Sequence, residues 1–101
     1  MQGKIEAADL LNRLDKGEKL TLLDVREEIE FYTFNIGGKN IPLQALGQNT
    51  GELGANKSEE IIVMCSAGLR SATATALLAE KGYTNVKNLT GGLLAVRKLK
   101  Y

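Results

Sequence analysis

Histidine and tryptophan are absent from the 101 residues of this sequence, and cysteine and proline occur once each. Without histidine the chain has neither Ser-His-Asp nor Cys-His catalysis, and it lacks the helical zinc motif that is built on paired histidines. A single cysteine, Cys65, excludes an internal disulfide and a multi-cysteine zinc or iron–sulfur site. The sequence therefore predicts no metal and no other cofactor.

An excess of charge of one sign is also lacking, because 13 Lys and Arg residues face 12 Asp and Glu residues, for a net charge of +1. A balanced chain offers no bulk attraction for nucleic acid or for an anionic membrane, so we expect neither as a partner. No run of about 18 apolar residues is present to span a bilayer, and residues 1–6 lack the apolar core of a secretion signal. We expect a cytoplasmic protein with a single domain over residues 1–101.

Two short runs of apolar, mostly branched residues, 20–25 and 61–64, predict strands that are buried on both faces of a sheet. Apolar residues at helical spacing predict one helix over 7–14 and another, rich in alanine, over 69–81. Strand and helix patterns therefore alternate, which is typical of an α/β fold with a mainly parallel sheet. Weaker patterns predict a short helix over 27–34, a short strand at 40–41, a surface loop over 48–58, a last strand over 86–89 and a terminal helix over 92–98.

Three aromatic side chains, Phe31, Tyr32 and Phe34, fall within the predicted short helix. We expect these rings to pack in the core, because large apolar side chains are usually buried. The alternative is that they form part of a contact surface for another protein.

The segment that carries chemistry follows the second apolar run and precedes the alanine-rich helix. A loop at this place can aim successive main-chain N–H groups inward, and the start of the helix adds about half a positive charge. Gly68 supplies the backbone freedom for such a curve, and the Arg70 guanidinium favours an anion. We therefore expect the thiol of Cys65 to have a lowered pKa and to lie exposed at the carboxyl edge of the sheet. The candidate site residues are Cys65, Ser66, Ala67, Gly68, Leu69, Arg70 and Ser71.

Two alternatives apply to single residues of this loop. A lone cysteine at the end of a buried strand is often a small, inert hydrophobic residue, so Cys65 could be structural. Serines near the start of a helix are more often caps than catalytic groups, so Ser66 and Ser71 are expected first as caps.

Four segments, in this order, resemble the motifs of the rhodanese-like domains, and together they span essentially the whole chain. The resemblance implies a five-stranded parallel sheet that is flanked by helices on both faces. It also implies that Asp24 and Arg26 support the site: Asp24 by accepting hydrogen bonds from loop amides near Cys65, and Arg26 by pairing with Glu27 or Glu30. The four segments are Leu23-Asp24-Val25-Arg26-Glu27 with Glu30-Phe31, then Ile36–Leu43, then Cys65–Ser71, and finally Gly91-Gly92-Leu93 with Ala95.

The same resemblance implies sulfurtransferase activity, in which Cys65 takes the sulfane sulfur of a donor and becomes a persulfide. Thiosulfate or a low-molecular-weight persulfide is the implied donor, and cyanide, a thiol or a protein cysteine is the implied acceptor. Ser66 stands where many members carry a basic residue, so Arg70 is the only charged side chain of the loop. A module that relays sulfur to a partner protein, with little turnover of small molecules, is the alternative. Phosphatase activity is disfavoured, because cysteine phosphatases generally place the arginine six residues after the cysteine and not five.

Overall fold

The fold is a single sheet of five parallel strands, and the computed structural model describes residues 2–101 of the chain. The strands lie in the order β1-β5-β4-β2-β3, so β4 has a neighbour on each side and β1 and β3 form the edges. The predicted α/β fold with a parallel sheet is confirmed. The strands are β1 (Gln2–Glu6), β2 (Thr21–Asp24), β3 (Lys39–Asn40), β4 (Ile61–Met64) and β5 (Val86–Thr90).

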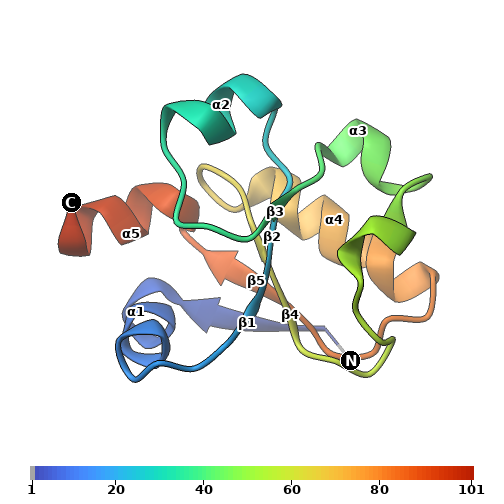
Figure 1. Cartoon of the computed structure of the whole chain (residues 1–101), viewed down its shortest axis with the longest axis horizontal. Helices are drawn as coiled ribbons and strands as arrows, with labels where there is room; N and C mark the ends of the chain where they lie inside the picture. The colour runs from blue at the N-terminus through green and yellow to red at the C-terminus, as the bar shows by residue number, and fades with distance from the viewer. Residues whose placement is uncertain (1) are drawn as a thin grey trace.

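Helices cover both faces of this sheet. Figure 1 shows α1 and α5 on one side, α3 and α4 on the other, and α2 above the end of the sheet. Across residues 2–101, none of these helices has the length and apolar character that a bilayer crossing needs. The helices are α1 (Ala7–Asp15), α2 (Glu28–Thr33), α3 (Leu43–Leu46), α4 (Leu69–Glu80) and α5 (Gly92–Lys100), and a 3-10 turn lies at Thr50–Leu53.

The central strand β4 is apolar without interruption because both of its faces are covered. Side chains alternate between the faces of a strand, so Ile61 and Val63 enter the core under α3 and α4. Ile62 and Met64 enter the core under α1 and α5. This strand therefore has the same bounds as the sequence pattern predicts.

Two elements, β1 and α3, were not predicted from the sequence. Strand β1 is an edge strand that pairs with β5 alone, and Ile5 is its buried hydrophobic residue. It therefore carries little of the apolar pattern that identifies buried strands. Helix α3 is four residues long, which is too short for a helical period to show in the sequence.

The aromatic residues of α2 do not pack as expected. No residue of α2 is buried, and Tyr32 is 77% exposed, so the prediction of a core position is wrong for this ring. Phe31 is half-buried and belongs to neither hydrophobic core. Phe34, the residue after α2, is half-buried and packs against the core on the α1 and α5 side. The reason is the place of α2 above the sheet end, where it covers no apolar sheet surface of its own.

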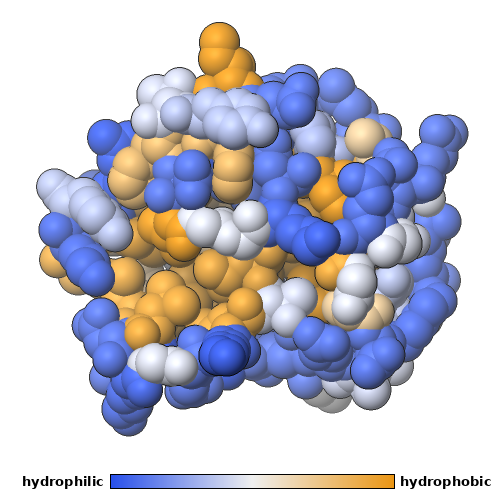
Figure 2. Space-filling model, in the orientation of Figure 1, coloured by the Kyte–Doolittle hydropathy of each residue, from blue (hydrophilic) through white to orange (hydrophobic). Residues whose placement is uncertain are grey.

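Half-buried apolar side chains extend the core beneath α1 to the molecular surface. They belong to Leu11, Leu14, Leu20 and Ile36. Figure 2 shows hydrophobic atoms gathered at the lower left, over the region of α1, whereas hydrophilic atoms cover most of the right side. Single apolar residues at a surface are ordinary, but these four side chains belong to one hydrophobic cluster.

A carboxylate joins α1 to the sheet. Glu60, which immediately precedes β4, accepts hydrogen bonds from Arg13 of α1 at 2.5 and 3.1 Å and from Lys87 of β5 at 2.6 Å. The hydrogen bonds from Arg13 are the main reason that the pKa of Glu60 falls to about 2, against the opposing effect of partial burial.

We predict that this carboxylate stabilises the fold at neutral pH and ceases to do so in acid. A depressed pKa in the folded state gives stability that is present above the ordinary pKa of 4.5 and is lost as the pH falls through about 2. Urea unfolding across this range should show that Glu60→Gln reduces the acid dependence of the free energy of unfolding. Glu80→Gln, at an exposed residue without an ion pair in the described chain, is the matched control. Equal acid dependence in Glu60→Gln and the wild type would contradict the prediction.

Candidate active site

Main-chain amides point at the sulfur of Cys65, the residue immediately after β4. The N–H of Gly68 donates to Cys65 Sγ at 3.1 Å, and the N–H of Ser71 donates at 3.3 Å. Gly68 has φ 99° and begins the turn into α4, so the loop closes beneath the first turn of that helix. The amides of Gly68 and Ser71 therefore point inward, as predicted.

The sulfur itself is buried, with Cys65 only 1% exposed, so the expectation of an exposed sulfur is wrong. Burial is the largest influence on the thiol and raises its pKa. The hydrogen bonds from the Ser71 hydroxyl and from the N–H groups of Ser71, Gly68 and Ala67 outweigh burial, so the pKa of Cys65 lies below its ordinary value. A buried sulfur held by inward N–H groups differs from an inert core cysteine, because its surroundings favour the thiolate.

Helix α5 fixes the first two peptide groups of the loop. Leu93 N–H donates to the carbonyl of Cys65 at 2.9 Å, and Leu94 N–H donates to the carbonyl of Ser66 at 3.0 Å. These are amides of the first turn, which have no partner within the helix. Gly92 allows the approach, because a Cβ there would lie 2.3 Å from the Ser66 carbonyl oxygen. The closing Gly-Gly-Leu motif thus acts as a support for the loop.

Asn88 of β5 is a site residue that sequence reasoning missed. Its Nδ2 donates to the carbonyl of Gly68 at 3.2 Å, and its Oδ1 accepts a hydrogen bond from the Ser71 hydroxyl. Ser71 Oγ also lies 3.3 Å from Cys65 Sγ, and its single hydrogen can serve only one acceptor at a time. A thiolate is a strong acceptor, so ionisation favours donation to sulfur. A polar residue near the carboxyl end of a parallel strand was the available signal.

Neither serine of the loop caps α4. The cap residue is Gly68, which has no side-chain cap hydrogen bond, so the expectation of serine caps is wrong. Ser71 instead contacts the sulfur, as described above. Ser66 Oγ accepts a hydrogen bond from Arg70 Nη2 at 3.2 Å and lies 3.5 Å from a Glu30 oxygen.

Arg70 points its guanidinium at a carboxylate of α2. Its Nη1 and Nη2 donate to the two oxygens of Glu30 at 2.7 and 2.9 Å. This two-pronged hydrogen bonding is the main reason that the pKa of Arg70 is raised, and the nearby Cys65 and Asp24 contribute less. Arg70 thus lies within electrostatic reach of the sulfur, but its hydrogen bonds go elsewhere.

Asp24 and Arg26 pair with each other beneath the site, which corrects the partners expected for both. Arg26 Nε donates to Asp24 Oδ1 at 3.0 Å, and Nη2 donates to Oδ2 at 2.8 Å. Asp24 therefore receives its hydrogen bonds from Arg26 rather than from amides of the cysteine loop, and Arg26 pairs with neither Glu27 nor Glu30. Asp24 is fully buried and Arg26 nearly so. Buried charges of opposite sign pair in this way because an unpaired one would be costly.

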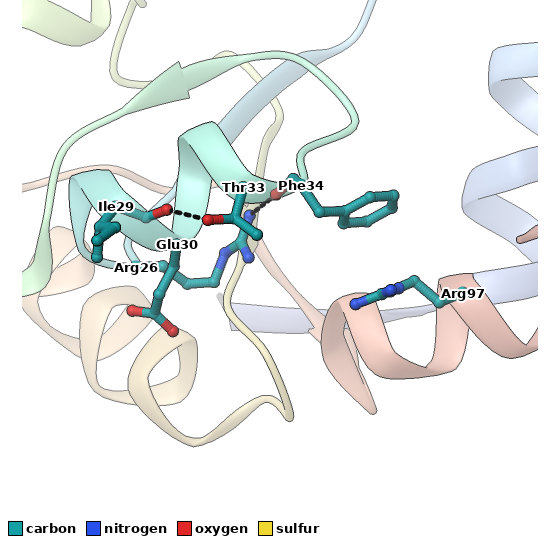
Figure 3. Close-up of a pocket in the computed structure, with 6 residues that line it drawn as sticks. All are labelled: Arg26, Ile29, Glu30, Thr33, Phe34 and Arg97. Atoms are coloured by element: carbon teal, nitrogen blue, oxygen red, sulfur yellow. Dashed lines mark hydrogen bonds between the residues drawn. The ribbon is translucent and has the colours of Figure 1, made fainter.

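A cavity of about 250 Å³ lies between α2 and α5, beside the loop. Figure 3 shows Glu30 and Arg26 on one side of it and Arg97, which extends from α5, on the other. The Arg97 guanidinium lies 4.7 Å from the centre of the Phe34 ring. Because Glu30 also pairs with Arg70, this cavity adjoins the cysteine loop. Its lining residues are Arg26, Ile29, Glu30, Thr33, Phe34 and Arg97.

Comparison with known proteins identifies the family. Residues 6–99 match the model of the rhodanese-like domain. The probable adenylyltransferase/sulfurtransferase MoeZ of Mycobacterium tuberculosis is 32% identical over 95 residues, which are 93% of this chain and 24% of MoeZ. Thiosulfate sulfurtransferase PspE of Escherichia coli is 35% identical over 81 residues, which are 77% of each chain. The solution structure of the rhodanese-like domain of the Anabaena protein Alr3790 superposes with a TM-score of 0.88, at 28% identity, over 99% of this chain and 76% of that one.

The chain therefore belongs to the rhodanese-like domain family. It spans about a quarter of the length of MoeZ.

We predict that the Ser71 hydroxyl helps to set the pKa of Cys65. Ser71→Ala removes a hydrogen bond to the thiolate, so the pKa should rise towards the ordinary value of a thiol. The ultraviolet absorbance of the thiolate, followed against pH with Cys65→Ser as the blank, measures this change. Ser66→Ala is the matched control, because Ser66 bonds to Arg70 and Glu30 and not to the sulfur, and its effect should be smaller. An equal shift in the two variants would contradict the assignment.

Proposed function

We propose that this protein is a sulfurtransferase that carries a sulfane sulfur on Cys65 as a persulfide. The observation that carries the proposal is the pair of main-chain N–H donors, from Gly68 and Ser71, that point at Cys65 Sγ. The main-chain donors that favour the thiolate would also favour the persulfide anion, because both are sulfur anions formed on Cys65 within the same loop.

The proposed reaction has two displacement steps. The Cys65 thiolate attacks the outer sulfur of the donor, a new sulfur–sulfur bond forms, and the donor's own bond to that sulfur breaks. With thiosulfate as the donor, sulfite leaves with the bonding electron pair and Cys65 becomes a persulfide anion. An acceptor nucleophile then attacks the outer sulfur, and the thiolate is released again. When cyanide is the acceptor, the product is thiocyanate.

The relatives support this class of reaction. The names of MoeZ and PspE both include sulfurtransferase, and PspE is called a thiosulfate sulfurtransferase. For this chain we propose thiosulfate or a low-molecular-weight persulfide as the donor, and cyanide, a thiol or a protein cysteine as the acceptor. The loop from Ser66 to Ser71 would hold the transferred sulfur, and Asp24 and Arg26 would support it from below.

A second candidate function is relay of sulfur to a partner protein. Three apolar side chains near the loop are exposed to solvent: Leu69 at 81%, Ile29 at 78% and Leu94 at 52%. Apolar residues that gather around a reactive group favour contact with another protein. Transfer from the persulfide to a protein thiol that is much faster than transfer to cyanide would favour this function.

We predict that a sulfane donor adds about 32 Da to the protein, the mass of one sulfur atom. Intact-mass measurement after incubation without reducing agent should show the adduct on the wild type. Cyanide should then remove it with release of thiocyanate.

Cys65→Ser, which replaces the only cysteine, is the control and should show no adduct with any donor. Circular dichroism verifies that this variant is folded. A wild-type protein that gains no mass with thiosulfate or with a thiol persulfide would overturn the proposed function.

A further inference from the structure

The cysteine loop has a single charged side chain, and the fold neutralises it. Arg70 donates to both oxygens of Glu30, at 2.7 and 2.9 Å, so its guanidinium is committed to a carboxylate. Ser66 Oγ accepts from Arg70 and lies near the same carboxylate, which closes a small polar network over one side of the loop. An anionic donor that approaches Cys65 therefore meets Arg70 as part of a neutral pair and not as a free cation.

The carboxylate is held in place from its own helix. Glu30 lies in the first turn of α2, and its Oε2 also accepts a hydrogen bond from the N–H of Glu27 at 2.9 Å. The Arg70 guanidinium is the main cause that lowers the pKa of Glu30 to about 2. Glu30 is therefore ionised at every pH at which the loop would react.

We propose that Glu30 sets the donor specificity of Cys65 by masking the Arg70 charge, so that the loop favours donors with one negative charge over doubly charged thiosulfate. The inference rests on the proposed sulfur transfer. The preferred class is thus a thiol persulfide, or any sulfane compound with one charge next to the transferred sulfur.

The physical reason is the sum of charges around the reacting sulfur. A thiolate at Cys65, the Arg70 guanidinium and the Glu30 carboxylate together carry one negative charge. A dianion is repelled by this group about twice as strongly as a monoanion at the same distance. Removal of the Glu30 charge brings the sum to zero and frees the guanidinium, which benefits the dianion more.

The test compares two donors that undergo the same displacement. Thiosulfate releases sulfite, and an alkanethiosulfonate, which carries a single charge, releases a sulfinate; in both cases Cys65 retains one sulfur. The kcat/KM for each donor is measured with cyanide as acceptor, for the wild type and for Glu30→Gln. We expect the ratio of thiosulfate to thiosulfonate kcat/KM to rise about tenfold in Glu30→Gln, the effect of one unmasked charge near the site.

Glu28→Gln is the matched control, because it removes the same charge from the same helix. Glu28 is exposed and has no hydrogen bond or ion pair to a side chain in the described chain. Its donor ratio should equal that of the wild type. A ratio that is unchanged in Glu30→Gln, or one that shifts equally in both variants, would overturn the inference.

A measurement on the wild type serves if Glu30→Gln does not fold. Ionic strength is raised from about 0.01 M to about 0.1 M, over which the Debye length shrinks from about 30 to about 10 Å. With a masked Arg70, kcat/KM for thiosulfate should not decrease. A clear decrease would show that a free cation attracts the dianion, and would overturn the inference.

The outcome for the proposed function is read separately, by intact mass. If neither donor adds sulfur to Cys65 in the wild type, the proposed function fails. If both donors add sulfur but the ratio and the salt dependence do not behave as stated, only the role of Glu30 fails.

Discussion

The site depends on one constraint, the two hydrogen bonds that main-chain amides of α5 donate to the carbonyls of Cys65 and Ser66. With these two carbonyls held by Leu93 and Leu94, the loop turns its own N–H groups towards the sulfur. Main-chain donors have fixed positions, so they need no reorganisation when the sulfur is charged. The support comes from α5, which follows β5 and lies far from Cys65 in the sequence. The chemistry of the cysteine loop thus depends on how β4, α4 and α5 pack together.

Much of the fold is predictable because the parallel sheet is buried. Strand β4 has an unbroken apolar run, since helices cover both of its faces. Helix α4 was predictable as an alanine-rich helix but not by its buried face, which consists of Ser71, Ala74, Thr75 and Leu78. Strand β1 lies at an edge, with Ile5 as its buried hydrophobic residue, and therefore lacks that pattern. The prediction for the aromatic rings in and beside α2 failed in the opposite direction, because an apolar pattern was present but burial was not. Apolar character alone predicts burial, but Tyr32 belongs to a helix above the end of the sheet that buries none of its residues.

At the site, local features were predictable and partnerships were not. The loop, its inward amides and the lowered pKa of Cys65 follow from a strand, a glycine and a helix start that are adjacent in the sequence. The partners of charged side chains depend on the fold. Arg26 reaches Asp24, two residues before it, and Arg70 reaches Glu30, forty residues before it. Asn88 was not predicted at all. Its role depends on two hydrogen bonds to the loop, which its side-chain amide makes from β5, the strand next to β4.

The depth of Cys65 has a consequence for which sulfur atom other molecules could reach, before and after the proposed persulfide forms. The thiol lies at the floor of its loop, almost without contact to solvent. In the proposed persulfide, the added sulfur atom would lie about 2 Å from Sγ and would extend beyond the buried thiol. A bulky oxidant that cannot enter the ring of amides would spare the resting thiol. In the proposed reaction, an acceptor would therefore contact the transferred sulfur before it contacts the cysteine.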